Sequence, residues 1–316
     1  MLTDVEGTDR RAPDLVPFSI LAERPVLAAV LGALSIAFSA VLVRLSGAEP
    51  ATAAIFRCLY ALPFLAVLAF RERRAYGPRP ASQIRLAWLA GVFFAIDLVV
   101  WHHTIGFVGA GLATVLGNTQ VVIVALLAWL LLSERPSNRL LAAIPVVLVG
   151  VVLISGVIGT GAYGSNPLLG VITGVVTGLS YGAFLLVLRH GNADLRRPAG
   201  PLFDATWVAV IASILMGLPL GEVDLVPTFP GHFYLIALAL SSQVVGWLLI
   251  SVSLPRLPAA LTSVILTIQP VASVLLGIAL VHETPSPVQL LGAATIVAGL
   301  TVATLRTTKP VPMAGG

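Results

Sequence analysis

The chain has few charged residues. Only 10% of its 316 residues are Asp, Glu, Lys or Arg, whereas 58% are hydrophobic, and the mean hydropathy is +1.00. A soluble domain of ordinary composition carries about 25% charged residues. A bilayer accommodates so much apolar sequence, because each spanning helix needs about 20 mostly apolar residues. The shortage of charge therefore indicates a membrane protein and excludes an ordinary soluble domain.

Motifs of catalytic chemistry are equally scarce. The single cysteine, Cys58, excludes an internal disulfide and a cysteine-based metal cluster. The chain has no H-E-x-x-H helix and no Cys/His cluster, so we expect no metal, no cofactor and no enzymatic activity. His102 and His103 near Asp97 are the sole candidate site of an enzyme, and they lack a nucleophile. The net charge of +4 does not indicate nucleic-acid binding, since the basic residues lie in short gaps between apolar runs.

The chain does contain a long series of apolar runs. The polar residues 1–24 predict a cytoplasmic tail rather than a cleaved signal peptide, and residues 306–316 predict a second cytoplasmic tail. The fold-class prediction is an all-α membrane protein of ten transmembrane helices joined by short turns. The predicted spans are 25–45, 51–70, 85–106, 109–132, 138–156, 167–188, 203–220, 232–254, 258–281 and 286–305.

The basic residues lie on one side of these spans. If the N-terminus is cytoplasmic, the inner segments hold every Lys and Arg except Arg44 and Arg57, which lie within spans. The outer loops hold none, and the loop at 221–231 carries Glu222 and Asp224 instead. Because cytoplasmic loops are enriched in Lys and Arg, the pattern predicts that both termini are cytoplasmic.

One passage is written twice. The run LLLSERPS and the later run ALVHETPS both place Glu, any residue, Pro and Ser in the same order. A shift of 149 residues lays 112–155 on 261–304 without a gap, which indicates an internal repeat of five helices. We place the first repeat at 25–156 and the second at 167–305.

The repeat explains one difference between the copies. Because five is an odd number, the second repeat enters the membrane the opposite way round. Arg135 of the first copy then faces the cytoplasm, and its counterpart Thr284 faces outside, where positive charge is disfavoured. Inverted repeats are the architecture of alternating-access transporters, with the substrate site near the midplane between the repeats.

These features resemble the EamA-type ten-helix members of the drug/metabolite transporter superfamily. The likeness rests on two five-helix repeats, each with a Glu-x-Pro turn before a last Gly-bearing helix, and it covers about residues 25–305. Arg57 in IFRCLYALPF is similar to the Arg commonly found in the second helix of these proteins, but the seventh helix has no matching Arg. The resemblance implies a transporter. Members export amino acids and other metabolites, and related branches move nucleotide sugars or triose phosphates.

Polar side chains inside the membrane are costly and mark a cavity or a helix contact. Thr114 and Asn118 are four residues apart in the fourth helix, and the shift of 149 lays them on Ser263 and Thr267 in the ninth. A spacing of four places two side chains on one helix face. These residues either line a cavity or join helices by hydrogen bonds, and the spacing does not distinguish the two.

Two further helices show a polar residue followed four residues later by tryptophan. Asp97 and Trp101 lie in the third helix, and Gln243 and Trp247 lie in the eighth. A polar head with an aromatic wall suits a small amphipathic metabolite, so we predict that these four residues line a substrate cavity. The alternative is an aromatic belt at the membrane interface.

Arg57 lies at a depth close to that of Asp97. At a rise of about 1.5 Å per residue, the two depths differ by only about 5 Å. The two side chains therefore either form a buried structural ion pair, or Arg57 binds a substrate carboxylate. The sequence favours the structural pair.

Other polar positions complete the set. Ser39 in the first helix, and Tyr181 with Thr177 in the sixth, suit a cavity lining or close helix packing. Gln120 and Gln269 lie off the cavity face, and we expect them to make structural contacts.

The leading interpretation is a monomeric, multi-pass transporter in a bacterial inner membrane that exports amino acids or related small metabolites. Its partners would be a small-molecule substrate and the lipid bilayer. A drug or multidrug exporter is the alternative, although Asp97 is the only intramembrane carboxylate. A membrane-embedded enzyme is less favoured.

Overall fold

The computed structural model describes residues 24–120, 122–123, 126, 138–191, 194, 196–253, 265 and 268–304. Every regular element in these residues is a helix, which confirms the all-α fold class there. The SERPS turn, Ser263 and Thr267 lie outside the described residues. The helices are α2 (Pro25–Ala37), α3 (Ser39–Ser46), α4 (Pro50–Tyr76), α5 (Ala81–Val108), α6 (Ala110–Gly117), α8 (Asn138–Ile154), α9 (Pro167–Gly191), α10 (Ala199–Gly217), η1 (Leu218–Leu220), α11 (Gly231–Leu238), η2 (Ala239–Gly246), α12 (Trp247–Ser253), α14 (Ile268–Val281) and α15 (Pro287–Thr304).

Several of these helices have the length and composition of membrane spans. Large apolar side chains on their outer faces are exposed, among them Val67 (59%), Leu148 (58%) and Leu215 (65%). A surface of this kind requires lipid rather than water around it. Shorter apolar helices lie at Leu141–Ile154, Ile268–Val281 and Pro287–Val302. The helices long and apolar enough to cross a membrane are Pro25–Ser46, Pro50–Tyr76, Ala81–Val108, Pro167–Leu188, Ala199–Leu220 and Gly231–Ile250.

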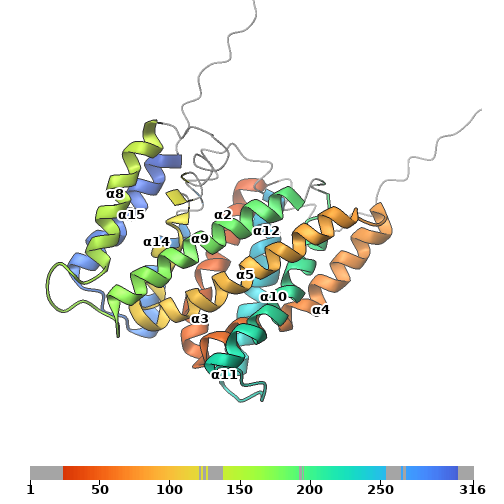
Figure 1. The fold of residues 1–316 in the computed structure, drawn as a ribbon, viewed down its shortest axis with the longest axis horizontal. Coiled ribbons are helices and arrows are strands. Elements are labelled where there is room, and N and C mark those ends of the chain that lie inside the picture. Colours follow the sequence, from red (N-terminus) through yellow and green to blue (C-terminus); the bar gives the residue numbers. More distant parts are fainter. Residues whose placement is uncertain are drawn as a thin grey trace, which may run out of the picture.

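The helices pack in pairs that join the two halves of the chain. α4 packs on α10, α6 on α14 and α8 on α15. The rod formed by α2 and α3 packs on α11, η2 and α12, while α5 packs on α9 (Figure 1). A shift of 149 residues exchanges α4 with α10 and α8 with α15, and it exchanges the last two pairs with each other. A twofold relation produces contacts of this reciprocal kind.

Small residues allow the close pairs to form. At Gly150 in α8, an added Cβ would lie 2.6 Å from a side-chain atom of Ile296 and 2.7 Å from the carbonyl oxygen of Gly292 in α15. At Gly299, it would lie 2.9 Å from Val147. Membrane helices gain most of their association energy from such close packing, because lipid is as apolar as their side chains.

The two ends of the helix bundle differ in charge. One end holds the arginine-rich segments 71–80 and 194–198, and we call it the basic end. The other end holds segments 47–50, 218–230 and 282–286, which carry glutamates and an aspartate, and we call it the acidic end. α4 and α10 run in opposite directions between these two ends, because the last turn of each helix contacts the first turn of the other.

A glutamate at each end caps a helix of the other half. At the basic end, Glu72 of α4 accepts hydrogen bonds from the backbone N–H groups of Ala199 (2.8 Å) and Gly200 (2.7 Å) at the start of α10. At the acidic end, Glu222, which follows α10, accepts one from the N–H of Ala51 (3.3 Å) at the start of α4. Carboxylates satisfy the free N–H groups of a helix N-terminus and favour its positive dipole.

The glutamate of the repeated Glu-x-Pro turn has the same role. Glu283 is 2% exposed, and its carboxylate accepts hydrogen bonds from the N–H groups of Ala110 (2.6 Å) and Gly111 (3.1 Å) at the start of α6. Arg44 lies 3.4 Å from the same carboxylate and donates to the Tyr163 hydroxyl at 2.9 Å. The turn therefore fastens the second half of the chain to the first. Arg44 also places one basic side chain at the acidic end, where Glu283 offsets its charge.

Candidate functional site

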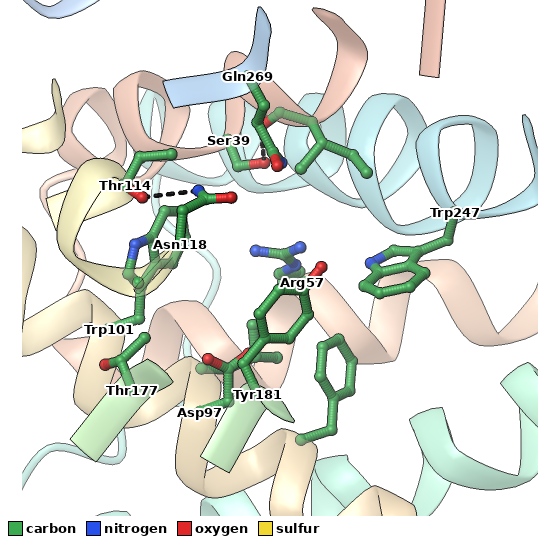
Figure 2. A pocket seen from close by; sticks show the side chains of 14 residues that line it. Ser39, Arg57, Asp97, Trp101, Thr114, Asn118, Thr177, Tyr181, Trp247 and Gln269 are labelled. Carbon is green, nitrogen blue, oxygen red and sulfur yellow. Dashed lines mark hydrogen bonds between the residues drawn. The ribbon is translucent and has the colours of Figure 1, made fainter. Parts of the chain in front are cut away.

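A small cavity lies at the centre of the bundle. Its volume is about 70 Å³, and its walls come from both halves of the chain (Figure 2). Seven helices or their ends contribute: α2, α3, α4, α5, α6, α9 and α12, with α14 closing one side. The lining residues are Ile36, Ser39, Arg57, Phe94, Asp97, Leu98, Trp101, Thr114, Gly117, Asn118, Thr177, Tyr181, Trp247 and Gln269.

Three irregular stretches of backbone converge on this cavity. The first rod is interrupted at Phe38, next to Ser39, and α6 ends at Gly117 in a turn at Asn118. η2 is a π-helical segment directly before Trp247. Irregular backbone at membrane depth is tolerated where it is buried in protein or lines a cavity, and π-helical turns often mark functional sites. The local chain geometry is thus irregular on several sides of the cavity.

Arg57 of α4 provides the positive charge in the cavity. Its side chain is 4% exposed, and its guanidinium donates to Gln243 Oε1 and to Ser242 Oγ, both at 3.2 Å. Ser242 in turn shares a hydrogen bond of 2.8 Å with Ser39. Gln243 donates to Thr206 Oγ1 at 3.2 Å. These neutral partners fix the position of the guanidinium without neutralising its charge.

Asp97 of α5 faces the same cavity but does not pair directly with Arg57. Among the described residues, no guanidinium nitrogen lies within 4.0 Å of its carboxylate. The sequence favoured a structural ion pair between the two, and the structure instead holds Arg57 through Ser242 and Gln243. One guanidinium and one carboxylate therefore face a shared space and remain available to a ligand.

Aromatic rings form the walls on two sides. The guanidinium carbon of Arg57 lies 5.9 Å from the centre of the Trp101 ring, a geometry that holds a cation over an aromatic face. On the other side Trp247 packs edge-on against Phe184 (5.4 Å) and Tyr181 (6.1 Å). The indole N–H of Trp247 is buried and has no hydrogen-bond partner among the described residues. A buried donor without a partner is costly, and a ligand acceptor would satisfy it.

Most of the predicted site residues meet in this cavity. Eight of them are in the lining, namely Ser39, Asp97, Trp101, Thr114, Asn118, Tyr181, Trp247 and Arg57. Gln243 is not: it is fully buried and lies behind Arg57 as a positioning residue. Gln243 was predicted to lie on the same helix face as Trp247 from a repeat of 3.6 residues per turn. This stretch is π-helical, so four residues turn through a smaller angle. Ser263 and Thr267 lie outside the described residues.

Sequence reasoning missed part of the lining. Gln269 lines the cavity, although its position predicted a structural contact. Pro270 follows it directly and lacks the N–H that would hold a regular helical turn, so helical phase is a poor guide there. Thr177, one turn before Tyr181, also lines the cavity, which is one of the two roles that the sequence predicted for it. Nothing in the sequence distinguishes Phe94 as a lining residue, since an apolar side chain fits any buried face.

The two histidines predicted at the mouth of the third helix have different surroundings. His102 is 3% exposed, and its Nδ1 lies 2.9 Å from the carbonyl oxygen of Pro50. His103 Nε2 lies 3.1 Å from Glu222 Oε1, the carboxylate that caps α4. Neither histidine lines the central cavity. In the part of the chain that is described, no three His, Cys, Asp or Glu side chains cluster as they would around a metal ion.

Comparison with known proteins agrees with this architecture. The EamA-like transporter family matches residues 24–156 and again residues 168–305. The chain belongs to this family. It is therefore a multi-pass membrane protein of the drug/metabolite transporter superfamily, and the resemblance seen in the sequence is confirmed.

Individual relatives are more distant. The chain is 26% identical over 178 residues to "Uncharacterized transporter sll1319" of Synechocystis sp.. That match covers 52% of this chain and about half, 50%, of the relative. One protein crystal structure is 17% identical, with a TM-score of 0.59, over 89% of this chain and 97% of the solved one. At this identity the structural likeness concerns the fold alone.

Proposed function

We propose that this EamA-family transporter exports amino acids or closely related small metabolites across a bacterial inner membrane. The observation that carries the proposal is the central cavity in which Arg57 and Asp97 face a common space without pairing. A zwitterion presents a carboxylate and an ammonium group, and these match the two charges. Trp101 and Trp247 offer apolar walls for the remainder of the ligand.

The size of the cavity favours a small substrate. A volume of about 70 Å³ is far below the roughly 300–1,000 Å³ of pockets that hold drug-sized ligands. The lining also carries one guanidinium and one carboxylate, so it is balanced in charge rather than acidic. Both properties suit a compact zwitterion better than a bulky organic cation.

We propose further that the cavity opens alternately to each side between two inverted repeats, 25–156 and 167–305, with both termini cytoplasmic. The reciprocal helix pairs and the exchanged glutamate caps support a twofold relation between the halves. The antiparallel course of α4 and α10 supports the inversion. The arginine-rich basic end supports a cytoplasmic location of that end.

Flux into proteoliposomes tests the substrate. We expect uptake of a subset of radiolabelled amino acids, competed by unlabelled amino acid but neither by its N-acetyl derivative nor by its methyl ester. In Asp97→Asn, discrimination against the N-acetyl derivative should fall, while Arg57→Leu should lose discrimination against the ester. Asp224→Asn, in the loop after α10, is the matched control and should behave as wild type. Transport of hydrophobic cations with no amino acid flux would replace this proposal with the drug exporter.

Accessibility to a thiol reagent tests the topology. Cys58 is buried and would be replaced by serine, and single cysteines would then be placed at Ser137 and Ser286 in turn. In intact cells we expect an impermeant reagent to label the cysteine at 286 and to spare the one at 137. Equal labelling of both positions would contradict the inverted arrangement.

A further inference from the structure

A second, larger cavity lies at the basic end, away from the central site. Its volume is about 440 Å³, and it opens between the last turns of α4, the turn that leads to α5, and the first turns of α10. Three arginines line it, Arg73, Arg79 and Arg197, together with two carboxylates, Glu72 and Asp204. None of these residues belongs to the central cavity, so the transport site gives them no role.

The two carboxylates are already engaged. Both oxygens of Glu72 accept hydrogen bonds from the N–H groups of Ala199 and Gly200 at the start of α10. Asp204 is paired with Nη2 of Arg79. Oxygen atoms of both carboxylates are therefore occupied by donors of the protein itself.

Arg79 keeps an unused donor. Its Nη1 is buried and has no hydrogen-bond partner among the described residues. Arg197 donates to the carbonyl oxygens of Gly77 and Tyr76, and its Nε lies 3.2 Å from Asp194 as an ion pair.

Arg197 also shares this counter-charge with a neighbour. Hydrogen bonds from Arg196 lower the pKa of the Asp194 carboxyl to about 2, so Asp194 serves two arginines at once. The side chain of Arg73 is exposed and contacts no described carboxylate. The buried guanidinium N–H of Arg79 that has no partner, beside the exposed Arg73, forms a site for an oxyanion.

The rest of the cavity is apolar. Its apolar lining residues are Ala66, Ala69 and Phe70 of α4, Ile84 of α5 and Phe203 of α10. Phe70 is 55% exposed, on the outer face of α4, so the apolar part continues onto the surface that faces lipid. A free inorganic anion would leave this half unused, whereas an amphiphile with a phosphate head and an acyl chain would use both halves.

We propose that this cavity binds the phosphate headgroup of an anionic phospholipid, with Arg73, Arg79 and Arg197 around the phosphate and the acyl chain along Phe70 and Phe203. Basic pockets between membrane helices bind such headgroups, and the negative leaflet raises their local concentration. The lipid would tie α4 to α10, the pair that the Glu72 cap already joins.

The test compares two arginines on the same helix. Purified protein is reconstituted in nanodiscs of phosphatidylcholine alone or with phosphatidylglycerol, and thermal unfolding and lipid retention in native mass spectrometry are measured. We expect phosphatidylglycerol to raise the unfolding temperature of wild type and to remain bound. Arg73→Gln should lose at least half of this rise and most of the retained lipid. Arg71→Gln changes an exposed arginine outside the cavity and should keep both.

Three outcomes would overturn the proposal. An equal loss in Arg71→Gln would show that only the general surface charge matters. A rise of the same size with millimolar inorganic phosphate in detergent would assign the cavity to a free anion rather than to a lipid. No preference of the wild type for phosphatidylglycerol would remove the site altogether.

The Arg79→Gln/Asp204→Asn double variant, which keeps a neutral hydrogen-bonding pair, tests the buried part of the cavity. It should fold normally and lose lipid retention. None of these measurements depends on the transported substrate.

Discussion

The glutamate caps at the two ends of the α4–α10 pair occupy equivalent places but differ in their surroundings. Glu72, at the basic end, is 3% exposed, binds two backbone N–H groups and lies among arginines. Glu222, at the acidic end, has a side chain that is 16% exposed, binds one N–H group, and lies 3.1 Å from His103.

The difference teaches that a repeated contact need not be equally strong in both copies. Two short hydrogen bonds beside arginines hold the start of α10 more firmly than one hydrogen bond of 3.3 Å holds the start of α4. The predictions below separate these two caps by the size of their effects.

The largest effect is expected from Glu72→Ala. The substitution leaves two N–H groups at the start of α10 without an acceptor and removes the carboxylate beside the arginines. A buried donor left without a partner costs about 1–3 kcal/mol, so the loss of unfolding free energy should reach about 3 kcal/mol. Thermal or denaturant unfolding of the purified protein measures it. A loss no larger than that of Glu222→Ala would erase the distinction between the caps.

The matched change Glu222→Ala should cost less. It removes a single bond of 3.3 Å to Ala51 and the contact with His103. The expected loss is about 1 kcal/mol, typical of a helix N-cap. The same unfolding experiment applies, with Asp224→Ala in the same loop as the control, which should stay closer to wild type.

Thr52 stabilises only the acidic-end cap. Its hydroxyl donates to the carbonyl oxygen of Glu222 at 2.6 Å and accepts from the N–H of Asp224 at 2.9 Å. The shift of 149 residues lays Thr52 on Pro201, which has no hydroxyl, so the basic end has no equivalent. Thr52→Val should lower the unfolding free energy by about 0.5–1 kcal/mol. In a Glu222→Ala background, Thr52→Val should still lower the unfolding free energy, because Thr52 bonds to the backbone of residues 222 and 224. If Thr52→Val had no effect in that background, the Glu222 side chain would be needed for the contribution of Thr52.

The smallest effect is expected from His103→Gln. The substitution removes the contact of 3.1 Å between the imidazole Nε2 and Glu222 Oε1, and both side chains are partly exposed. The loss of unfolding free energy should be about 0.5 kcal/mol, as for partly exposed pairs.

A second variant isolates this contribution. His103→Arg keeps a donor beside the Glu222 carboxylate and should retain most of the stability. His102 is hydrogen-bonded to the Pro50 carbonyl rather than to Glu222 and remains intact in both variants. A loss in His103→Arg as large as that in His103→Gln would show that the contact with Glu222 contributes nothing.

Much of this protein followed from its sequence for a simple reason: a bilayer imposes strong rules on composition. Apolar runs of about 20 residues indicated a membrane protein made of helices. The family was indicated by the repeated Glu-x-Pro turn together with the arginines on one side of the spans. The rare polar residues within the spans carried most of the cavity, because burying them in lipid is too costly unless they face one another or a ligand.

Only the tertiary structure decided which faces meet. Periodicity tells which side chains share a face of one helix, but it does not tell which helix lies opposite, nor does it hold where the helix becomes π-helical, as before Trp247. Gln243 and Ser242 therefore emerged as the partners of Arg57, in place of Asp97, through contacts across 185 and 186 residues of chain. The caps that Glu72 and Glu222 each make on a helix of the other half also depend on tertiary packing. The N–H groups of a helix N-terminus can donate to any nearby carboxylate, and only the packing of α4 against α10 brings those two within reach.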